Sequence, residues 1–263
     1  IFRHFANCTK QEILLKGSET PDAATALHLD NALQKLLRHV PVQYITGEAW
    51  FYNLKFRVNE HVLIPRPETE ELVQEAINFL KIHRGKKVLE IGTGSGCIAI
   101  SIKKNIPGAE IISVDISADA LKTAKANAEL NNVSVEFRQM DFLDEENYNN
   151  LGKFDVIISN PPYIPAHDKV KLDKNVALHE PAIALFVPDK DPLIFYRHMF
   201  SFANEHLADG GCILLEIHEY LAKQIQALLT TQSKQAKITK DSLEKEKMAV
   251  SIKKTVKNTG KRY

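Results

Sequence analysis

The chain has 263 residues, of which 44% are hydrophobic and 25% are charged, with a formal net charge of +1. The composition is that of a globular protein. The length suits one large domain with a small accessory piece. The near-neutral charge gives no overall electrostatic case for nucleic acid, and no apolar run is long enough to cross a membrane. Since no secretory signal pattern is present, we expect a cytoplasmic protein.

The cysteines and histidines do not suggest a metal centre. Three cysteines are an odd number without C-x-x-C spacing, which argues against both a disulfide framework and a thiolate zinc site. The histidines show no metal-ligand spacing, so no metal is expected. The basic tail after Ser251 is interpreted as a solvated terminus.

Residues 1–43 predict a small helical domain. Helix-forming stretches alternate with turns such as Gly17-Ser18, and residues 22–37 carry leucines at helical spacing. Such a domain is either a packing element or a platform for a macromolecular partner, and sequence alone favours packing. The chain opens on Ile1 rather than methionine, which leaves open a start further upstream.

Residues 44–67 predict a hairpin that links two domains. Two short alternating segments, 50–52 and 55–58, are separated by Asn53-Leu54. Pro65 and Pro67 then prevent a helix before Glu68, after which an apolar stripe predicts a helix that stops near Gly85.

A glycine loop follows the first strand of the main domain, residues 87–91. Gly92, Gly94 and Gly96 stand at every second position, so the backbone can pass close under a ligand. The spacing differs from the G-x-G-x-x-G dinucleotide fingerprint, and Glu90 just before it would repel a diphosphate but accept hydrogen bonds from an ammonium group.

The next strand, residues 110–114, ends in Asp115, about twenty residues past the glycines, where an acid can chelate ribose hydroxyls. A sugar without phosphate and an amino-acid end together describe S-adenosylmethionine. Ser117 caps a helix over 118–130, and residues 133–138 predict a third strand. Beyond it, Asp141 can accept from an adenine amino group and Phe142 can pack on the ring, although a plain turn is equally compatible.

The fourth strand, residues 154–159, leads into Asn-Pro-Pro-Tyr at 160–163. The two prolines stiffen the loop and remove two N–H donors, which leaves mostly acceptors. The oxygen of Asn160 and nearby carbonyls can hold both hydrogens of a planar –NH2 group while Tyr163 covers its face. An isolated motif of this kind is as readily a proline-rich turn.

Residues 164–191 show weak periodicity and several prolines, which is typical of a lid or binding loop. His179 and Glu180 invite a general-base role, but we favour a loop-orienting role for Glu180. A helix over 192–207, Gly210-Gly211, a strand over 212–217, a helix to about Thr230 and an antiparallel pair over 237–241 and 248–254 complete the chain. Strands alternating with helices predict a doubly wound, mostly parallel α/β sheet, with the late hairpin as one edge.

With these motifs placed, residues 41–217 resemble the class I S-adenosylmethionine-dependent methyltransferases, specifically the HemK-type release factor glutamine methyltransferases. The glycine loop and Asn-Pro-Pro-Tyr are superfamily signals. More specific are Pro-Val-Gln-Tyr-Ile-Thr-Gly at 41–47, Leu-Ile-Pro-Arg-Pro-Glu-Thr-Glu at 63–70, and Glu180-Pro181 followed by Ala184-Leu185. The resemblance implies a seven-stranded sheet and transfer of methyl from S-adenosylmethionine, giving S-adenosylhomocysteine, to the glutamine amide of the Gly-Gly-Gln loop of peptide chain release factors.

The resemblance also assigns roles. It implies substrate docking by 1–43, a linker over 44–67, and a methyltransferase domain over 68–263 that works as a monomer on a release factor. The family's usual Gly-Lys-Asp-Arg-like turn is replaced by Glu-Lys-Glu-Lys at 244–247. We expect catalysis by Asn160, Pro161 and Tyr163, substrate binding by these three with Pro162, Arg66 and Glu180, and cofactor binding by Glu90, Gly92, Thr93, Gly94, Gly96, Asp115, Ile116, Asp141, Phe142 and Asn160.

Two alternatives stay open. Adenine also offers a planar –NH2 group and can be flipped into such a pocket, so a nucleic-acid amino-group methyltransferase would use the same motif. Near-neutral charge and the acidic stretch at 67–70 argue against nucleic acid as a direct substrate. The other hypothesis is a non-catalytic adaptor that keeps the fold of a cofactor-binding domain. The intact glycine loop argues against it.

Overall fold

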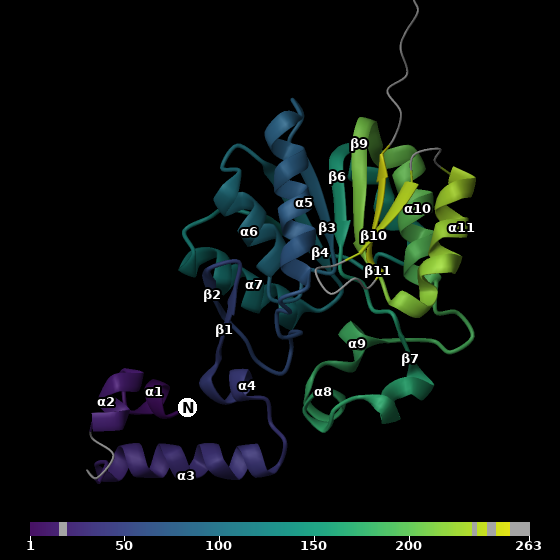
Figure 1. Ribbon diagram of the computed structural model, residues 1–263. Helices are drawn as coiled ribbons and strands as arrows, with labels where there is room; N and C mark the ends of the chain where they lie inside the picture. Colours follow the sequence, from purple (N-terminus) through teal and green to yellow (C-terminus); the bar gives the residue numbers. More distant parts are fainter. Residues whose placement is uncertain (16–19, 233–235, 241–245, 253–263) are drawn as a thin grey trace, which may run out of the picture.

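The computed structural model describes residues 1–15, 20–232, 236–240 and 246–252 (Figure 1). Its main body is a sheet with helices on both faces, and a small group of helices from the N-terminal segment lies beside it. No helix in these residues is long and apolar enough to span a membrane.

The central sheet has the strand order β10-β11-β9-β6-β3-β4-β5. Five neighbouring strands run parallel, while β11 is antiparallel to β9 and β10 to β11, which confirms the predicted doubly wound α/β class. The chain moves from β3 outwards through β4 and β5, then returns to the other side through β6 and β9, so the order reverses between β3 and β6. Ligands bind at such a reversal, outside the carboxyl ends of the strands. The strands are β3 (Lys87–Ile91), β4 (Glu110–Asp115), β5 (Glu136–Gln139), β6 (Phe154–Ser159), β9 (Leu207–Glu216), β10 (Ala236–Lys240) and β11 (Glu246–Ile252).

Alternation along the buried strands divides the core into two layers. Val88 faces one layer with α5 (Thr69–Ile82) and α6 (Cys97–Asn105), and α7 (Ala118–Leu130) lies on the same side. Leu89 faces the other layer with α10 (Ile194–His206) and α11 (Ala222–Gln232). Successive side chains of a strand point to opposite faces, so a near-continuous apolar run serves both layers at once.

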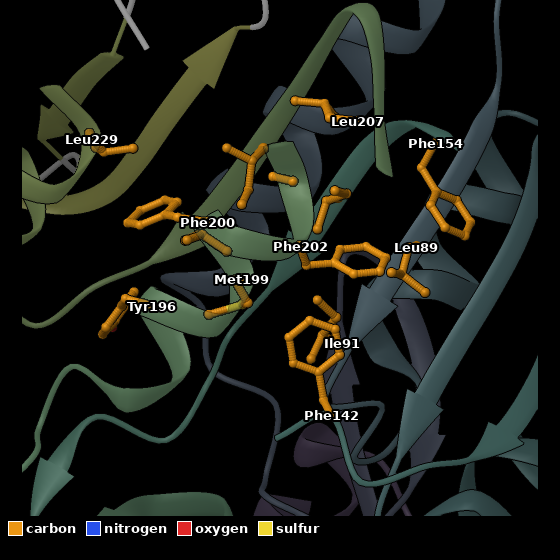
Figure 2. Packing of buried hydrophobic residues seen from close by; sticks show 14 of the residues in the cluster. Leu89, Ile91, Phe142, Phe154, Tyr196, Met199, Phe200, Phe202, Leu207 and Leu229 are labelled. Carbon is orange, nitrogen blue, oxygen red and sulfur yellow. The ribbon is translucent and has the colours of Figure 1, made fainter. Parts of the chain in front are cut away.

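Aromatic side chains fill the second layer behind the carboxyl end of β3 (Figure 2). The ring of Phe202 packs edge to face on Phe142 at 5.4 Å and on Tyr148 at 4.9 Å between centroids. Tyr148 belongs to η1 (Glu145–Asn150), and its hydroxyl donates to the Phe142 carbonyl at 2.6 Å. The loop after β5 is therefore fixed by the core beneath it.

The strand that contains Gly210-Gly211 starts earlier than predicted. β9 begins at Leu207, five positions before the expected start, and the glycines lie inside it. Gly210 has φ of 77°, and a Cβ on Gly211 would lie 2.8 Å from the Asp155 carbonyl oxygen. The pairing with β6 shifts register here, so the glycines mark a bulge inside the strand, where the prediction placed them before it. β5 is also displaced, covering Glu136–Gln139 instead of 133–138.

The predicted antiparallel pair near the end is present as β10 and β11. Its expected last residues, 241 and 253–254, lie outside the described residues, as do Glu244 and Lys245 of the Glu-Lys-Glu-Lys stretch and the basic tail from residue 253.

In the described residues 1–15 and 20–47, the helices before the hairpin are α1 (Phe2–Phe5), α2 (Lys10–Leu15), α3 (Ala23–Leu37) and α4 (Val42–Thr46). Asp22 caps α3 by accepting from the Thr25 N–H at 2.9 Å. Within α3 only Ala32 is buried, and the exposed fractions of Leu33 and Leu37 are 51% and 66%. The apolar face predicted from the leucine spacing is therefore turned largely to solvent.

The predicted hairpin is formed by β1 (Glu48–Phe51) and β2 (Leu54–Arg57). Its turn is Tyr52-Asn53, both with positive φ, one residue earlier than expected. The buried Asn127 of α7 binds the backbone of β2 at Arg57. Its side-chain oxygen accepts from the Arg57 N–H at 2.7 Å, and its side-chain amide donates to the Arg57 carbonyl at 2.9 Å.

The segment 164–191 is more structured than the predicted loop. It contains β7 (Ile164–Pro165), η2 (Ala166–Lys171), α8 (Lys174–His179), α9 (Ala182–Leu185) and β8 (Phe186–Val187), each of six residues or fewer. Elements this short cannot establish a period, which explains why the sequence pattern missed them. Figure 1 shows the segment below the carboxyl end of the sheet, towards the N-terminal helices.

Candidate active site

A cavity opens at the carboxyl ends of β3, β4 and β6, where the strand order reverses. Its wall also includes the 61–69 segment and part of α9. It brings together most residues that the sequence nominated: Arg66, Glu90, Gly92, Thr93, Gly94, Asp115, Ile116, Asp141, Phe142, Asn160, Pro161 and Pro162. Three nominated residues, Gly96, Tyr163 and Glu180, do not line it.

The glycine loop holds the carboxylate of Asp115 at the cavity edge. Gly94 N–H donates to one carboxylate oxygen at 2.8 Å and Ser117 N–H donates to the other at 2.9 Å. Burial raises the pKa of Asp115, while these N–H groups oppose the rise. Each oxygen keeps a further lone pair, so the group can accept from the two hydroxyls of a ribose.

Gly96 has a packing role in the structure. It precedes α6 with φ of 79°, and a Cβ there would meet Ile100 at 3.0 Å and Ala124 at 3.1 Å. The third glycine of the motif therefore allows α6 and α7 to approach one another, rather than lining the cavity.

Glu90 is fully buried at the inner end of the cavity. One carboxyl oxygen accepts from the Ser113 hydroxyl at 2.5 Å, and the other has no hydrogen-bond partner. Burial, with a smaller contribution from the charge of Asp115, raises the pKa of Glu90 to about 8. An unpartnered carboxyl oxygen beside a cavity is a site for a cationic donor such as an ammonium group.

The loop after β5 forms another part of the wall. Asp141 is exposed, and one of its oxygens accepts from Leu143 N–H at 2.9 Å. Phe142 is 5% exposed and its ring is packed into the aromatic core, so most of its surface is already covered. Ile116 is 44% exposed and gives the cavity an apolar surface that a flat ring could cover.

The Asn-Pro-Pro-Tyr loop is held from behind by a polar cluster. The Asn160 amide donates to the Thr69 hydroxyl at 3.3 Å, and Thr69 donates to Glu216 at 2.7 Å. The Tyr163 hydroxyl donates to the second oxygen of Glu216 at 3.4 Å. Burial, then the charge of Glu216, raises the pKa of Tyr163, so its phenol stays protonated. The ring of Tyr163 meets His218 at 5.6 Å between centroids.

Thr69 and Glu216 were missed by the sequence analysis. Glu216 ends β9, beside β6 in the sheet, and Thr69 begins α5. An acid that closes an apolar strand was a usable signal for Glu216. Its neighbours could not be inferred, because Thr69 and Glu216 are 147 positions apart.

Arg66 and Glu180 bind one another. The Arg66 guanidinium donates to one oxygen of Glu180, and Ile64 N–H donates to the other at 3.2 Å. The Glu180 side chain is 1% exposed, so its two oxygens are engaged away from solvent. This pair ties the 164–191 segment to the loop before α5. His179 contacts the Arg38 carbonyl at 2.9 Å and does not line the cavity.

Comparison with known proteins identifies the family. Residues 71–182 match the family described as "Methyltransferase small domain", and residues 1–47 match "PrmC N-terminal domain". A release factor glutamine methyltransferase from Flavobacterium psychrophilum is 44% identical over 232 residues, 87% of this chain and 81% of the relative. One from Bacteroides thetaiotaomicron is 40% identical over 84% of this chain and 78% of the relative.

The chain belongs to the release factor glutamine methyltransferase family. It is an S-adenosylmethionine-dependent methyltransferase, as the sequence analysis predicted. Among solved structures, a methyltransferase from Pyrococcus furiosus superposes with a TM-score of 0.53 at 20% identity, covering 86% of this chain and 99% of that chain. At this identity the likeness concerns the fold alone.

The residues of this methyltransferase fit S-adenosylmethionine as the cofactor. The unpartnered oxygen of Glu90 suits the ammonium group, and the carboxylate of Asp115 suits the ribose hydroxyls. Ile116 and Asp141 stand further along the same wall, where an adenine ring would lie. Among the described residues, no group of three or more histidine, cysteine or acidic side chains could hold a metal ion.

Proposed function

We propose that this chain transfers the methyl group of S-adenosylmethionine to the side-chain amide nitrogen of the glutamine in the Gly-Gly-Gln loop of a peptide chain release factor. The observation that carries the proposal is the acceptor-rich Asn160 loop, which lines the same cavity as Glu90 and Asp115. Relatives named release factor glutamine methyltransferase, matched over most of their length, support the same substrate.

The chemical task is to make an amide nitrogen nucleophilic. Its lone pair is delocalised into the carbonyl, so the free amide reacts poorly. The Asn160 side-chain oxygen and the Pro161 carbonyl accept the two N–H groups, orient the nitrogen and add electron density to it. When bound, S-adenosylmethionine supplies an electrophilic methyl group on a positively charged sulfonium.

The amide nitrogen bonds to the methyl carbon as the carbon–sulfur bond breaks, the bonding electrons stay on the sulfur of S-adenosylhomocysteine, and the nitrogen then loses one of its two protons to water. Alignment and electrostatics are therefore the main contributions of the protein. Alignment of two reactants can be worth about 7–11 kcal/mol in favourable cases. Glu180 is engaged by Arg66 and Ile64, and the phenol of Tyr163 stays protonated, so neither serves as a general base. Apolar groups such as Ile91 and Val114 on the cavity wall limit water beside the reacting atoms. Pro162 and Tyr163 shape the loop around the glutamine.

The N-terminal residues 1–43 form the docking domain in this proposal, with 44–67 as linker and 68–263 as the catalytic domain. Exposed leucines of α3, among them Leu27, Leu33 and Leu37, support docking over packing because the described chain leaves them largely uncovered. The proposal includes a monomeric enzyme that acts in the cytoplasm on a protein rather than on nucleic acid.

Transfer of labelled methyl groups tests the proposal. The acceptors are a purified release factor, the same factor with the Gly-Gly-Gln glutamine changed to alanine, and a panel of DNA and RNA. Labelling of the intact factor alone is expected. Labelling of nucleic acid instead would keep the cofactor site and overturn the substrate.

The Asn160→Ala variant tests the site assignment separately. It is expected to lose most of kcat while calorimetry finds the affinity for S-adenosylmethionine unchanged. Collapse of cofactor affinity with near-normal turnover would assign Asn160 to the cofactor alone.

A further inference from the structure

Behind Asn160 lies a partly buried chain of hydrogen bonds that the reaction as proposed does not use. Asn160 donates to Thr69 at 3.3 Å, Thr69 donates to Glu216 at 2.7 Å, and Tyr163 donates to Glu216 at 3.4 Å. Thr69 is 3% exposed and Glu216 is 5% exposed. The four residues come from three places in the fold: the start of α5, the loop after β6 and the end of β9.

The direction of each hydrogen bond in this chain is fixed by the acid at its end. Glu216 accepts one hydrogen bond at each carboxyl oxygen, from the hydroxyl of Thr69 and from the hydroxyl of Tyr163. A hydroxyl has one hydrogen. Because the Thr69 hydroxyl donates it to Glu216, the Thr69 oxygen can only accept a hydrogen bond from Asn160. The partner of that oxygen has to be a donor.

This requirement selects one of the two orientations of the Asn160 amide. The amide oxygen and nitrogen are nearly equal in size, so shape alone does not distinguish an amide from its flipped form. With the nitrogen held by Thr69, the oxygen lies at the opposite end of the group. In the flipped form, the side-chain oxygen of Asn160 would face the hydroxyl oxygen of Thr69 with no hydrogen between them.

We propose that Glu216 and Thr69 are positioning residues that set the orientation of Asn160, so that its oxygen and not its –NH2 group is offered to the substrate amide. This inference rests on the proposed function of Asn160. A flipped Asn160 would present donors to the donors of the target –NH2 group and could not hold it. The acid therefore acts on catalysis through the threonine and the asparagine, without touching the reacting atoms.

The decisive experiment is a double-mutant cycle between Thr69→Val and Asn160→Ala. Valine keeps the shape of threonine and removes the hydroxyl. In the wild-type background, Thr69→Val is expected to lower kcat on the release factor roughly 10–100-fold, by analogy with the range found for residues that orient metal ligands, with cofactor affinity unchanged. In the Asn160→Ala background the same change is expected to have no further effect, because the residue through which it acts is gone.

Three comparison variants separate positioning from stability. Thr69→Ser keeps the hydroxyl and is expected to restore kcat to within about twofold of wild type. Thr123→Val removes a hydroxyl of similar burial from α7, outside the cavity wall, and is expected to leave kcat unchanged. Thr69→Ala provides the same cycle if the valine variant does not fold.

The possible outcomes distinguish this inference from the proposed function. A Thr69→Val enzyme with wild-type kcat, or losses that multiply independently in the double variant, would overturn the positioning role while methylation of the factor stands. Equal loss in the serine and valine variants would also overturn it. A wild-type enzyme that does not methylate the factor would overturn the proposed function, and this inference with it.

Discussion

Replacing Glu90 by glutamine separates the stability of this fold from its affinity for the cofactor. Burial raises the pKa of Glu90 to about 8 in the folded protein from 4.5 for an ordinary glutamate. The folded state thus favours the neutral acid, so its contribution to stability is fully present below pH 4.5 and is lost as the pH rises through 8. Glutamine copies the neutral acid at every pH, and its oxygen can keep the Ser113 hydrogen bond.

The expected difference follows from the two pKa values. A shift of about 3.5 units corresponds to about 5 kcal/mol once the pH exceeds both values. At pH 5.5 the glutamine variant should exceed wild type in the free energy of unfolding by about 1 kcal/mol, at pH 7 by about 3 kcal/mol, and at pH 8.5 by between about 4 and 5 kcal/mol. Partial relaxation of the site would scale these values down together without changing their order.

Urea unfolding of the ligand-free protein at these three pH values measures the effect. The difference between variant and wild type isolates Glu90, since all other titrating groups are common to both. Glu110→Gln, at the exposed first residue of β4, removes a carboxylate from the same sheet and serves as the control. A Glu90→Gln difference that stays constant from pH 5.5 to 8.5 would refute the reasoning. Calorimetry should meanwhile find weaker binding of S-adenosylmethionine, because a bound ammonium group favours the ionised form of Glu90 and glutamine has no such form.

Three further substitutions test the site and its supports. Asp115→Ala should weaken S-adenosylmethionine binding about 10–100-fold by calorimetry, since charge-assisted hydrogen bonds are lost. Gly85→Ala should lower the free energy of unfolding by about 1–3 kcal/mol in urea, because its Cβ would lie 2.1 Å from an Asp155 carboxylate oxygen. Arg66→Gln should cost about 3 kcal/mol, since it leaves the buried Glu180 without its cation, and limited proteolysis should find cleavage within 164–191.

Each of these has a clear contrary outcome. Gly108→Ala is the control for Gly85→Ala, since nothing lies within 4 Å of a Cβ at Gly108, and equal losses at both glycines would argue against the contact with Asp155. Unchanged cofactor affinity in Asp115→Ala would remove Asp115 from the binding site. Unchanged unfolding and proteolysis in Arg66→Gln would show that the Glu180 pair does not anchor the segment.

Local pattern was enough to find the order of the main elements and both motif loops. The strand before Gly92 and the strand before Asn160 are near-continuous apolar runs, and both are central parallel strands in the sheet. Glycines at alternate positions and an acid after the next strand are local features, and the cavity unites them because parallel strands end at one edge. The position of Asp115 was predictable for this reason.

Long-range contacts decided the rest. Gly96 allows α6 and α7 to pack closely, because Ala124 of α7 lies 3.1 Å from where a Cβ on Gly96 would be. The ring of Phe142 belongs to the core, because it packs on Phe202 of α10. Gly210-Gly211 forms a bulge inside β9, rather than preceding the strand, where β9 passes close to the Asp155 carbonyl oxygen. A local pattern carries no information about such neighbours.

The sequence by itself determined the class of the sheet, the cofactor and the loop that we propose as the receiver of the substrate amide. Only the tertiary structure decided how that loop is held, since Thr69, Asn160 and Glu216 meet through the packing of α5 against the ends of β6 and β9. The physical reason is that hydrogen-bonding direction depends on which donor faces which acceptor. That pairing exists only once segments 147 positions apart have been brought together.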